Sequence, residues 1–144
     1  QLAQKVPLKN KIDWVNLLHS SYNVKGDGVT DDAVNIQAVL NEATSQGLGV
    51  YIPARTYILS TGRYRGDSTE WWGLKIPENS TLYIEKGAVF KLVDDAPPWS
   101  RVVTFENNIS IFGHLTIDGS ADTITNGNEH MAGVFMYGCK NIYI

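Results

Sequence analysis

The heptapeptide GDGVTDD at residues 26–32 constrains this chain most, because two glycines directly precede a segment with helical periodicity. Glycine tolerates the positive φ angles that a tight turn requires. We therefore expect a tight turn that leads straight into a helix over residues 31–45, with Thr30 as its N-cap. Asp31 and Asp32 would then lie in the first helical turn, where the helix dipole favours negative charge.

The segment after the heptapeptide has apolar residues at three- and four-residue spacing, which is typical of a helix with one buried face. These residues are Ala33, Ile36, Leu40 and Ala43. Gly47 is the expected C-terminal stop of this helix. Two short strands are predicted within residues 49–58, around a Pro-Ala turn, and an earlier strand within residues 13–17.

This order of motifs resembles the N-terminal part of the pectate-lyase superfamily. The similarity rests on GDGVTDD, on Ile36-Gln37 in the helix and on VYIPARTYIL at residues 50–59, and it is specific over residues 14–60. It implies a right-handed parallel β-helix, an all-β solenoid with an N-terminal capping α-helix. Residues 17–24 depart from the family pattern, and Arg55 stands where glycine is common.

A degenerate repeat continues beyond the matched segment. Leu82 and Ile109 begin similar alternating strands 27 residues apart, and Ile142 begins another 33 residues after Ile109. Repeats of this length with short alternating strands predict a solenoid whose coils stack their aliphatic residues. We expect residues 1–12 to form an arm or linker and residues 13–144 to form the cap and first coils of a truncated β-helix. The helix would cover the open end of the first coil.

Charge and composition give no support for some classes of partner. The net charge of -3 gives no reason to expect nucleic acid, and no apolar run is long enough to span a membrane. The one cysteine, Cys139, cannot form an internal disulfide and is expected to be a buried free thiol. Asn79 and Asn108 match the glycosylation sequon, but both precede strands at equivalent repeat positions, which favours a role in turns.

Candidate catalytic residues lie at the end of one predicted strand and in the loop that follows. Asp118 ends the strand, and Asp122, Glu129 and His130 belong to the loop. Carboxyl groups and histidine are the usual proton-transfer groups. The alternatives are a turn that begins at Asp118 and solvated loop side chains elsewhere. No complete hydrolase motif set is present, and the Asp94-Asp95 pair is expected in a solvated loop.

Candidate substrate-binding residues lie in two aromatic segments that we expect to be loops. These residues are Tyr64, Arg65, Trp71, Trp72, Trp99 and Arg101. Aromatic faces stack on sugar rings, and arginine pairs with the carboxylates of acidic glycans. The alternative is that one tryptophan of each segment packs its loop onto the coil. Trp71 and Trp72 would point to opposite sides if the backbone is extended.

The resemblance implies recognition, and with it degradation, of a polysaccharide by a glycoside hydrolase or lyase. A phage tailspike or appendage that acts on host cell-wall glycan fits this pattern, with an extracellular or virion-associated location. The alternative is a non-catalytic carbohydrate-binding adhesin or structural virion module. No cofactor is expected, although a calcium-dependent lyase or epimerase could draw ligands from Asp94, Asp95, Asp118 and Asp122. A homotrimer would cover the open end of the solenoid.

Overall fold

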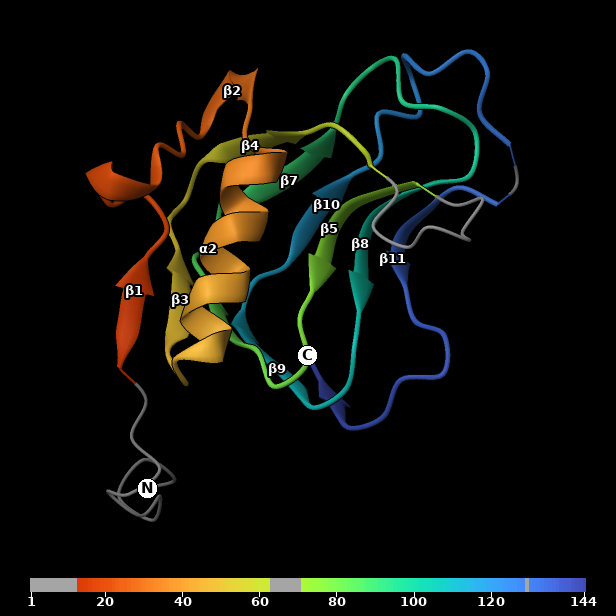
Figure 1. The fold of residues 1–144 in the computed structure, drawn as a ribbon. Coiled ribbons are helices and arrows are strands. Elements are labelled where there is room, and N and C mark those ends of the chain that lie inside the picture. The colour runs from red at the N-terminus through yellow and green to blue at the C-terminus, as the bar shows by residue number, and fades with distance from the viewer. Residues whose placement is uncertain (1–12, 63–70, 129) are drawn as a thin grey trace.

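The computed structural model describes residues 13–62, 71–128 and 130–144. Its strands form a three-sided solenoid of parallel sheets, with one α-helix packed against the first coil (Figure 1). The helical elements are the 3-10 helix η2 (Ser20–Tyr22) and α2 (Ala33–Ser45). The strands are β1 (Trp14–Asn16), β2 (Asp27–Asp31), β3 (Gly49–Ile52), β4 (Thr56–Leu59), β5 (Trp71–Ile76), β6 (Thr81–Ile84), β7 (Val89–Leu92), β8 (Ser100–Phe105), β9 (Ile109–Gly113), β10 (Thr116–Asp118), β11 (Ala132–Phe135) and β12 (Ile142–Tyr143).

Each complete coil contributes one strand to each of three sheets, and β1, β2 and β12 belong to incomplete coils at the two ends. Sheet A has the order β1-β3-β6-β9-β12, sheet B the order β10-β7-β4-β2, and sheet C the order β11-β8-β5. All pairs of these strands are parallel. The predicted parallel β-helix is therefore confirmed.

The register of sheet A differs from the sequence repeat by two residues at one step. Leu82 lies opposite Ile111 and not opposite Ile109, whereas Ile142 lies opposite Ile109 as predicted. A two-residue shift keeps every side chain on the same face of a strand. The apolar pattern alone therefore could not distinguish the two registers.

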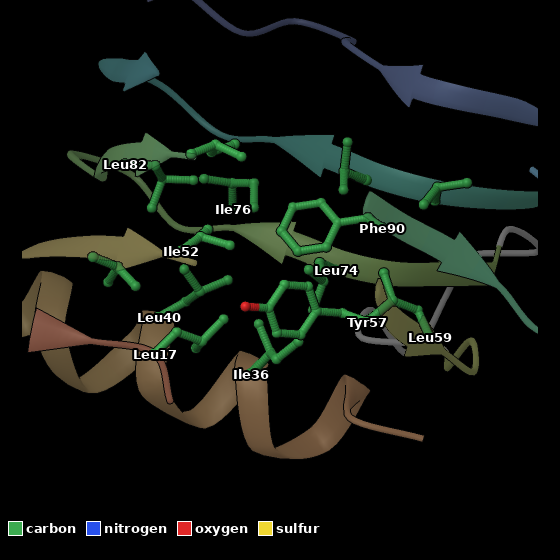
Figure 2. Packing of buried hydrophobic residues seen from close by; sticks show 14 of the residues in the cluster. Leu17, Ile36, Leu40, Ile52, Tyr57, Leu59, Leu74, Ile76, Leu82 and Phe90 are labelled. Atoms are coloured by element: carbon green, nitrogen blue, oxygen red, sulfur yellow. The ribbon is translucent and has the colours of Figure 1, made fainter. Parts of the chain in front are cut away.

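The core fills the space between the inner faces of the sheets. Tyr57 and Phe90, from neighbouring strands of sheet B, have ring centroids 5.8 Å apart, and the Tyr57 hydroxyl donates to the Pro53 carbonyl at 2.7 Å. Helix α2 covers this core with its buried face, which includes Ile36 and Leu40 (Figure 2). The helix thus caps the first coil, as the sequence predicts.

The heptapeptide that leads to α2 is built differently from the expectation. Asp27–Asp31 forms strand β2, and Asp32 is the N-cap residue, so neither Asp31 nor Asp32 lies in the first helical turn. The Thr30 hydroxyl does not cap the helix, because it donates to the Asp27 carboxylate at 2.7 Å. Pairing of β2 with β4 takes priority over the local capping pattern. At the other end, Gly47 follows the helix with a φ of +71°, as expected for its stop.

Asparagines turn the chain between sheet C and sheet A in successive coils. Asn79, Asn108 and Asn141 all have positive φ, between 57° and 68°. Asn108 donates from its amide to Asn79 at 3.2 Å, and Asn141 donates to Asn108 at 2.8 Å. Asparagine tolerates the left-handed region better than most residues. The turn role predicted for Asn79 and Asn108 is confirmed.

Two further features of the described residues bear on the sequence predictions. Cys139 is free, as expected, but it is only half-buried. No helix in the described part of the chain has the length and apolar character needed to cross a membrane.

Candidate functional site

The outer face of sheet B carries the polar residues that the fold brings together. Strands β4 and β7 alternate between buried and partly exposed residues, so every second side chain points outward. Two rows result from the parallel register. Thr56, Val89 and Thr116 form one row, and Ile58, Lys91 and Asp118 form the other.

Lys91 and Asp118 are neighbours across strands β7 and β10. The Lys91 Nζ lies 3.6 Å from Asp118 Oδ2, and both side chains are between a third and a half exposed. Asp118 Oδ1 also accepts a hydrogen bond from the Ser120 backbone N–H at 2.8 Å. Asp118 therefore begins a turn, which was the alternative prediction for this residue. It also faces outward beside the Lys91 ammonium group.

A hollow of about 510 Å³ adjoins this pair on the same face. Its chemically informative lining residues are Arg55, Lys91, Thr56 and Asp27. Arg55 is exposed, and glycines at positions 26, 28 and 87 complete much of the wall. The hollow thus presents two cations, one hydroxyl and one carboxylate, and its glycines add only backbone to the wall.

Hydrogen bonds hold the Asp27 side chain in the wall of this hollow. Its carboxylate accepts from the backbone N–H of Val29 at 2.9 Å, from that of Thr30 at 2.7 Å and from the Thr30 hydroxyl at 2.7 Å. These bonds, led by that from the Thr30 backbone, lower the pKa of Asp27 from 3.8 to about 2. Asp27 therefore stays ionised in mild acid and partly offsets the positive charge of the hollow.

We expect the ionised Asp27 carboxylate to stabilise the fold, and we expect this contribution to be lost in acid. Because its pKa is lower in the folded state, the unfolded state takes up the proton first as the pH falls. The contribution is therefore present above about pH 4 and is lost as the pH falls through about 2. In urea unfolding, the difference in midpoint between the wild type and Asp27→Asn should shrink from about pH 6 to about pH 2. A difference that stays constant over this range would contradict the prediction.

The loops after β7 and β10 lie together at one corner of the molecule, at the upper right of Figure 1. Thr123 donates its hydroxyl proton to Asp94 at 2.8 Å, and the Ser120 hydroxyl donates to the Leu92 carbonyl at 2.6 Å. The rings of Trp99 and His130 stack at 3.9 Å with an interplanar angle of 6°. Two of the predicted site residues, one from each loop, are thus brought together.

Other predicted binding residues occupy strands and not loops. Trp72 and Arg101 lie opposite each other in β5 and β8, and they are only 5% and 4% exposed. The Arg101 guanidinium sits 4.5 Å from the centre of the Phe135 ring. The loop prediction was wrong for these residues because β5 and β8 begin at Trp71 and Ser100. Trp71 is half-buried beside the buried Trp72, which agrees with the expected alternation.

The remaining predicted residues are placed as follows. Asp122 is exposed in the loop after β10, and Asp94 and Asp95 are exposed, as expected for a solvated loop. Tyr64, Arg65 and Glu129 lie outside the described residues. Within the described ranges, no group of three or more His, Cys, Asp or Glu residues is arranged to hold a metal ion.

Lys91 and Arg55 were not identified as site residues from the sequence. The available signals were weak. Lys91 is an outward position in the alternating strand VFKL, and Arg55 replaces the glycine that is common in the family pattern. Only the parallel register, which joins segments about a coil apart, places Lys91 beside Asp118.

Comparison with known proteins agrees with this architecture. Residues 14–73 match the family model described as "Rhamnogalacturonase A/epimerase, pectate lyase-like". This segment belongs to the pectate-lyase-like family. It contains the heptapeptide, α2 and the Arg55 turn, so the family match covers the first coil and one wall of the hollow.

Relatives of this chain include viral and bacterial proteins. The pre-neck appendage protein of Bacillus phage phi29 is 29% identical over 86% of this chain and 14% of its own length. Mannuronan C5-epimerase AlgE5 of Azotobacter vinelandii is 36% identical over 70% of this chain and 11% of its own length. The chain therefore spans only about a seventh or less of these relatives.

A solved structure shows the same fold. The A-module of mannuronan C-5 epimerase AlgE4 from Azotobacter vinelandii superposes with a TM-score of 0.64 and 28% identity. The match covers 89% of this chain and 33% of that module. The described part of the chain thus corresponds to about a third of a β-helix module.

Proposed function

We propose that the outer face of sheet B binds an acidic polysaccharide, in a β-helix protein that modifies this polysaccharide. The observation that carries the proposal is the hollow with Arg55 and Lys91, which lies directly beside Asp118. Cations that flank an elongated parallel face suit the carboxylates of successive sugar units. Relatives named as epimerases of mannuronan, a uronic acid polymer, support an acidic substrate.

The chemistry that fits this arrangement best is proton abstraction next to a sugar carboxylate. Such a reaction needs a base and a cation that neutralises the carboxylate as charge develops. Asp118 and Lys91 supply one group of each kind, 3.6 Å apart. Glycoside hydrolysis would instead require a second carboxyl group at a defined distance. We therefore assign the base to Asp118, the neutralising cation to Lys91, and a place beside the glycan to the Trp99–His130 stack.

A second candidate is a non-catalytic glycan-binding module of a virion. The similarity to the phage phi29 appendage protein over 86% of this chain favours it. In this reading Arg55 and Lys91 still bind the glycan, but Asp118 serves only its turn and ion pair. An extracellular or virion-associated location belongs to both candidates, and a homotrimer and a calcium requirement stay predictions.

The binding prediction concerns the two cations. We expect Arg55→Ala and Lys91→Ala each to weaken binding of a polymannuronate oligomer about tenfold, and the double variant more strongly. The affinity of the wild type should fall as salt rises, because exposed charges are screened. Isothermal titration calorimetry measures both effects. Lys140→Ala, which removes an exposed lysine outside the hollow, is the control and should leave the affinity unchanged.

A product assay then separates the two candidates. Unsaturated products or a change in uronate stereochemistry, lost in Asp118→Asn while binding is kept, would support catalysis. Binding without any product would favour the virion module. An affinity that does not respond to either cation variant would refute the sheet B site itself.

A further inference from the structure

A second set of exposed residues lies on the outer face of sheet A, and the hollow that they line shares no lining residue with the sheet B hollow. Aromatic side chains occupy outward positions of four strands there, namely Trp14 in β1, Tyr51 in β3, Tyr83 in β6 and Phe112 in β9. The register places Tyr51 opposite Tyr83 and Tyr83 opposite Phe112. Trp14, Tyr83 and Phe112 are 44%, 43% and 54% exposed. Exposed aromatic groups of this kind mark interaction sites.

Three of these rings shape a hollow. Tyr51 and Tyr83 stack with centroids 5.7 Å apart and planes at 15° to each other. Trp14 stands nearly perpendicular to Tyr83, at 82° and 6.4 Å. Together with Glu85 these rings line a space of about 390 Å³. This volume falls within the range of roughly 300–1,000 Å³ that is typical of small-ligand sites.

Glu85 provides a fixed hydrogen-bond acceptor at the edge of this hollow. Its Oε2 accepts from the Ala54 backbone N–H at 2.7 Å, which ties the side chain to the turn between β3 and β4. Desolvation and then the charge and hydrogen bond of Glu85 raise the pKa of Tyr51, so the phenol stays protonated and faces the carboxylate. The carboxylate is thus held in place before any ligand arrives.

The four lining residues select one type of occupant. Flat rings that meet at a right angle offer apolar contact to the C–H faces of a pyranose, while the carboxylate and phenol hydroxyls can bond its hydroxyl groups. The lining contains one carboxylate and neither lysine nor arginine. An acidic sugar would be repelled by Glu85, in contrast to the cationic hollow on sheet B.

We propose that Trp14, Tyr51, Tyr83 and Glu85 form a binding site for a neutral hexopyranose unit of a glycan. The site is separate from the acidic-glycan site on sheet B and does not depend on that proposal. Phe112, the next ring in the Tyr83 row, extends the platform for a neighbouring sugar unit. The chain would hold a neutral glycan on one face and an acidic glycan on another.

The test is a titration of the whole chain with cellohexaose, mannohexaose and chitohexaose. Calorimetry and tryptophan fluorescence measure the binding. We expect at least one of these neutral oligosaccharides to bind. Trp14→Ala and Tyr83→Ala should each weaken this binding about tenfold or more, and Tyr83→Phe, which keeps the ring, should weaken it less. These exposed side chains can be truncated without opening the core. Glu85→Gln should also weaken binding of the neutral oligosaccharide.

Two comparisons keep this site distinct from the one on sheet B. Arg55→Ala and Lys91→Ala should leave the affinity for the neutral oligosaccharide unchanged, and Tyr83→Ala should leave polymannuronate binding unchanged. If none of the three oligosaccharides binds, or if binding ignores Trp14→Ala and Tyr83→Ala, the proposal is wrong. It is also overturned if the wild type self-associates in sedimentation analysis and Tyr83→Ala abolishes that association, since the face would then be an interface between copies.

Discussion

Replacing Asp32 with alanine is expected to lower the free energy of unfolding by about 3–5 kcal/mol, because two hydrogen bonds to a buried carboxylate are lost. Asp32 is completely buried, and its carboxylate accepts from the backbone N–H groups of Lys25 and Gly26, both at 2.8 Å. The substitution leaves both donors without their acceptor, and Gly26 is itself buried. A buried donor without a partner costs far more than the net value of an average hydrogen bond.

Asp27→Ala is the matched control for this prediction. Asp27 also accepts from two backbone N–H groups, those of Val29 and Thr30, but it is exposed, so water can replace the lost acceptor. Urea unfolding of both variants at neutral pH compares the two sites directly. Asp32→Asn, which keeps one amide oxygen, should fall between the wild type and Asp32→Ala. Equal losses at Asp27 and Asp32 would mean that burial does not decide the effect.

The role of Asp32 shows why local capping rules gave the wrong start for helix α2. The sequence predicts that both aspartates, Asp31 and Asp32, belong to the first turn of α2. In the structure Asp31 ends β2 and accepts from the Ala33 and Ser60 backbones, while Asp32 turns back toward Lys25 and Gly26. The Ser60 contact spans 29 residues, and no local pattern contains it.

The fold itself was readable from the sequence because each coil repeats its own apolar pattern. Alternating aliphatic residues such as Leu82 and Ile84 recur about once per coil, and they bury one face of each strand whatever the partner register. The register was less readable, since moving a strand by two residues preserves the pattern. This is why Leu82 was aligned with Ile109 and not with its true partner, Ile111.

The candidate site depends on single polar and aromatic residues and on strand pairing, which the apolar repeat does not specify. Asp118 was found because an acid at a strand end stands out, and Trp99 and His130 because they interrupt polar loops. Trp72 and Arg101 were assigned to loops because the start of a strand after a long connection carries no clear signal. Lys91 became informative only once β7 and β10 were paired, which placed its Nζ 3.6 Å from Asp118.

The second large effect is expected at Gly113, where we predict that alanine lowers the free energy of unfolding by about 3–5 kcal/mol. Gly113 has a φ of +95°, and a Cβ atom built there would lie 2.0 Å from the Ile84 carbonyl oxygen. That oxygen accepts from the His114 backbone N–H at 2.9 Å, so it cannot move away without breaking the contact between two coils. Alanine must therefore separate β6 from β9 or distort both strands.

Gly47→Ala separates this clash from backbone strain. Gly47 also has a positive φ, of +71°, but a Cβ atom there would meet nothing within 4 Å. Its substitution should cost only the strain of a left-handed alanine, roughly 1–2 kcal/mol. Chemical unfolding measures both losses, and hydrogen exchange at His114 reports whether the bond to Ile84 has opened. If Gly113→Ala costs no more than Gly47→Ala and the His114 amide keeps its protection, the coils tolerate the added methyl group. In that case the close approach of β6 and β9 at Gly113 does not contribute to stability as the geometry indicates.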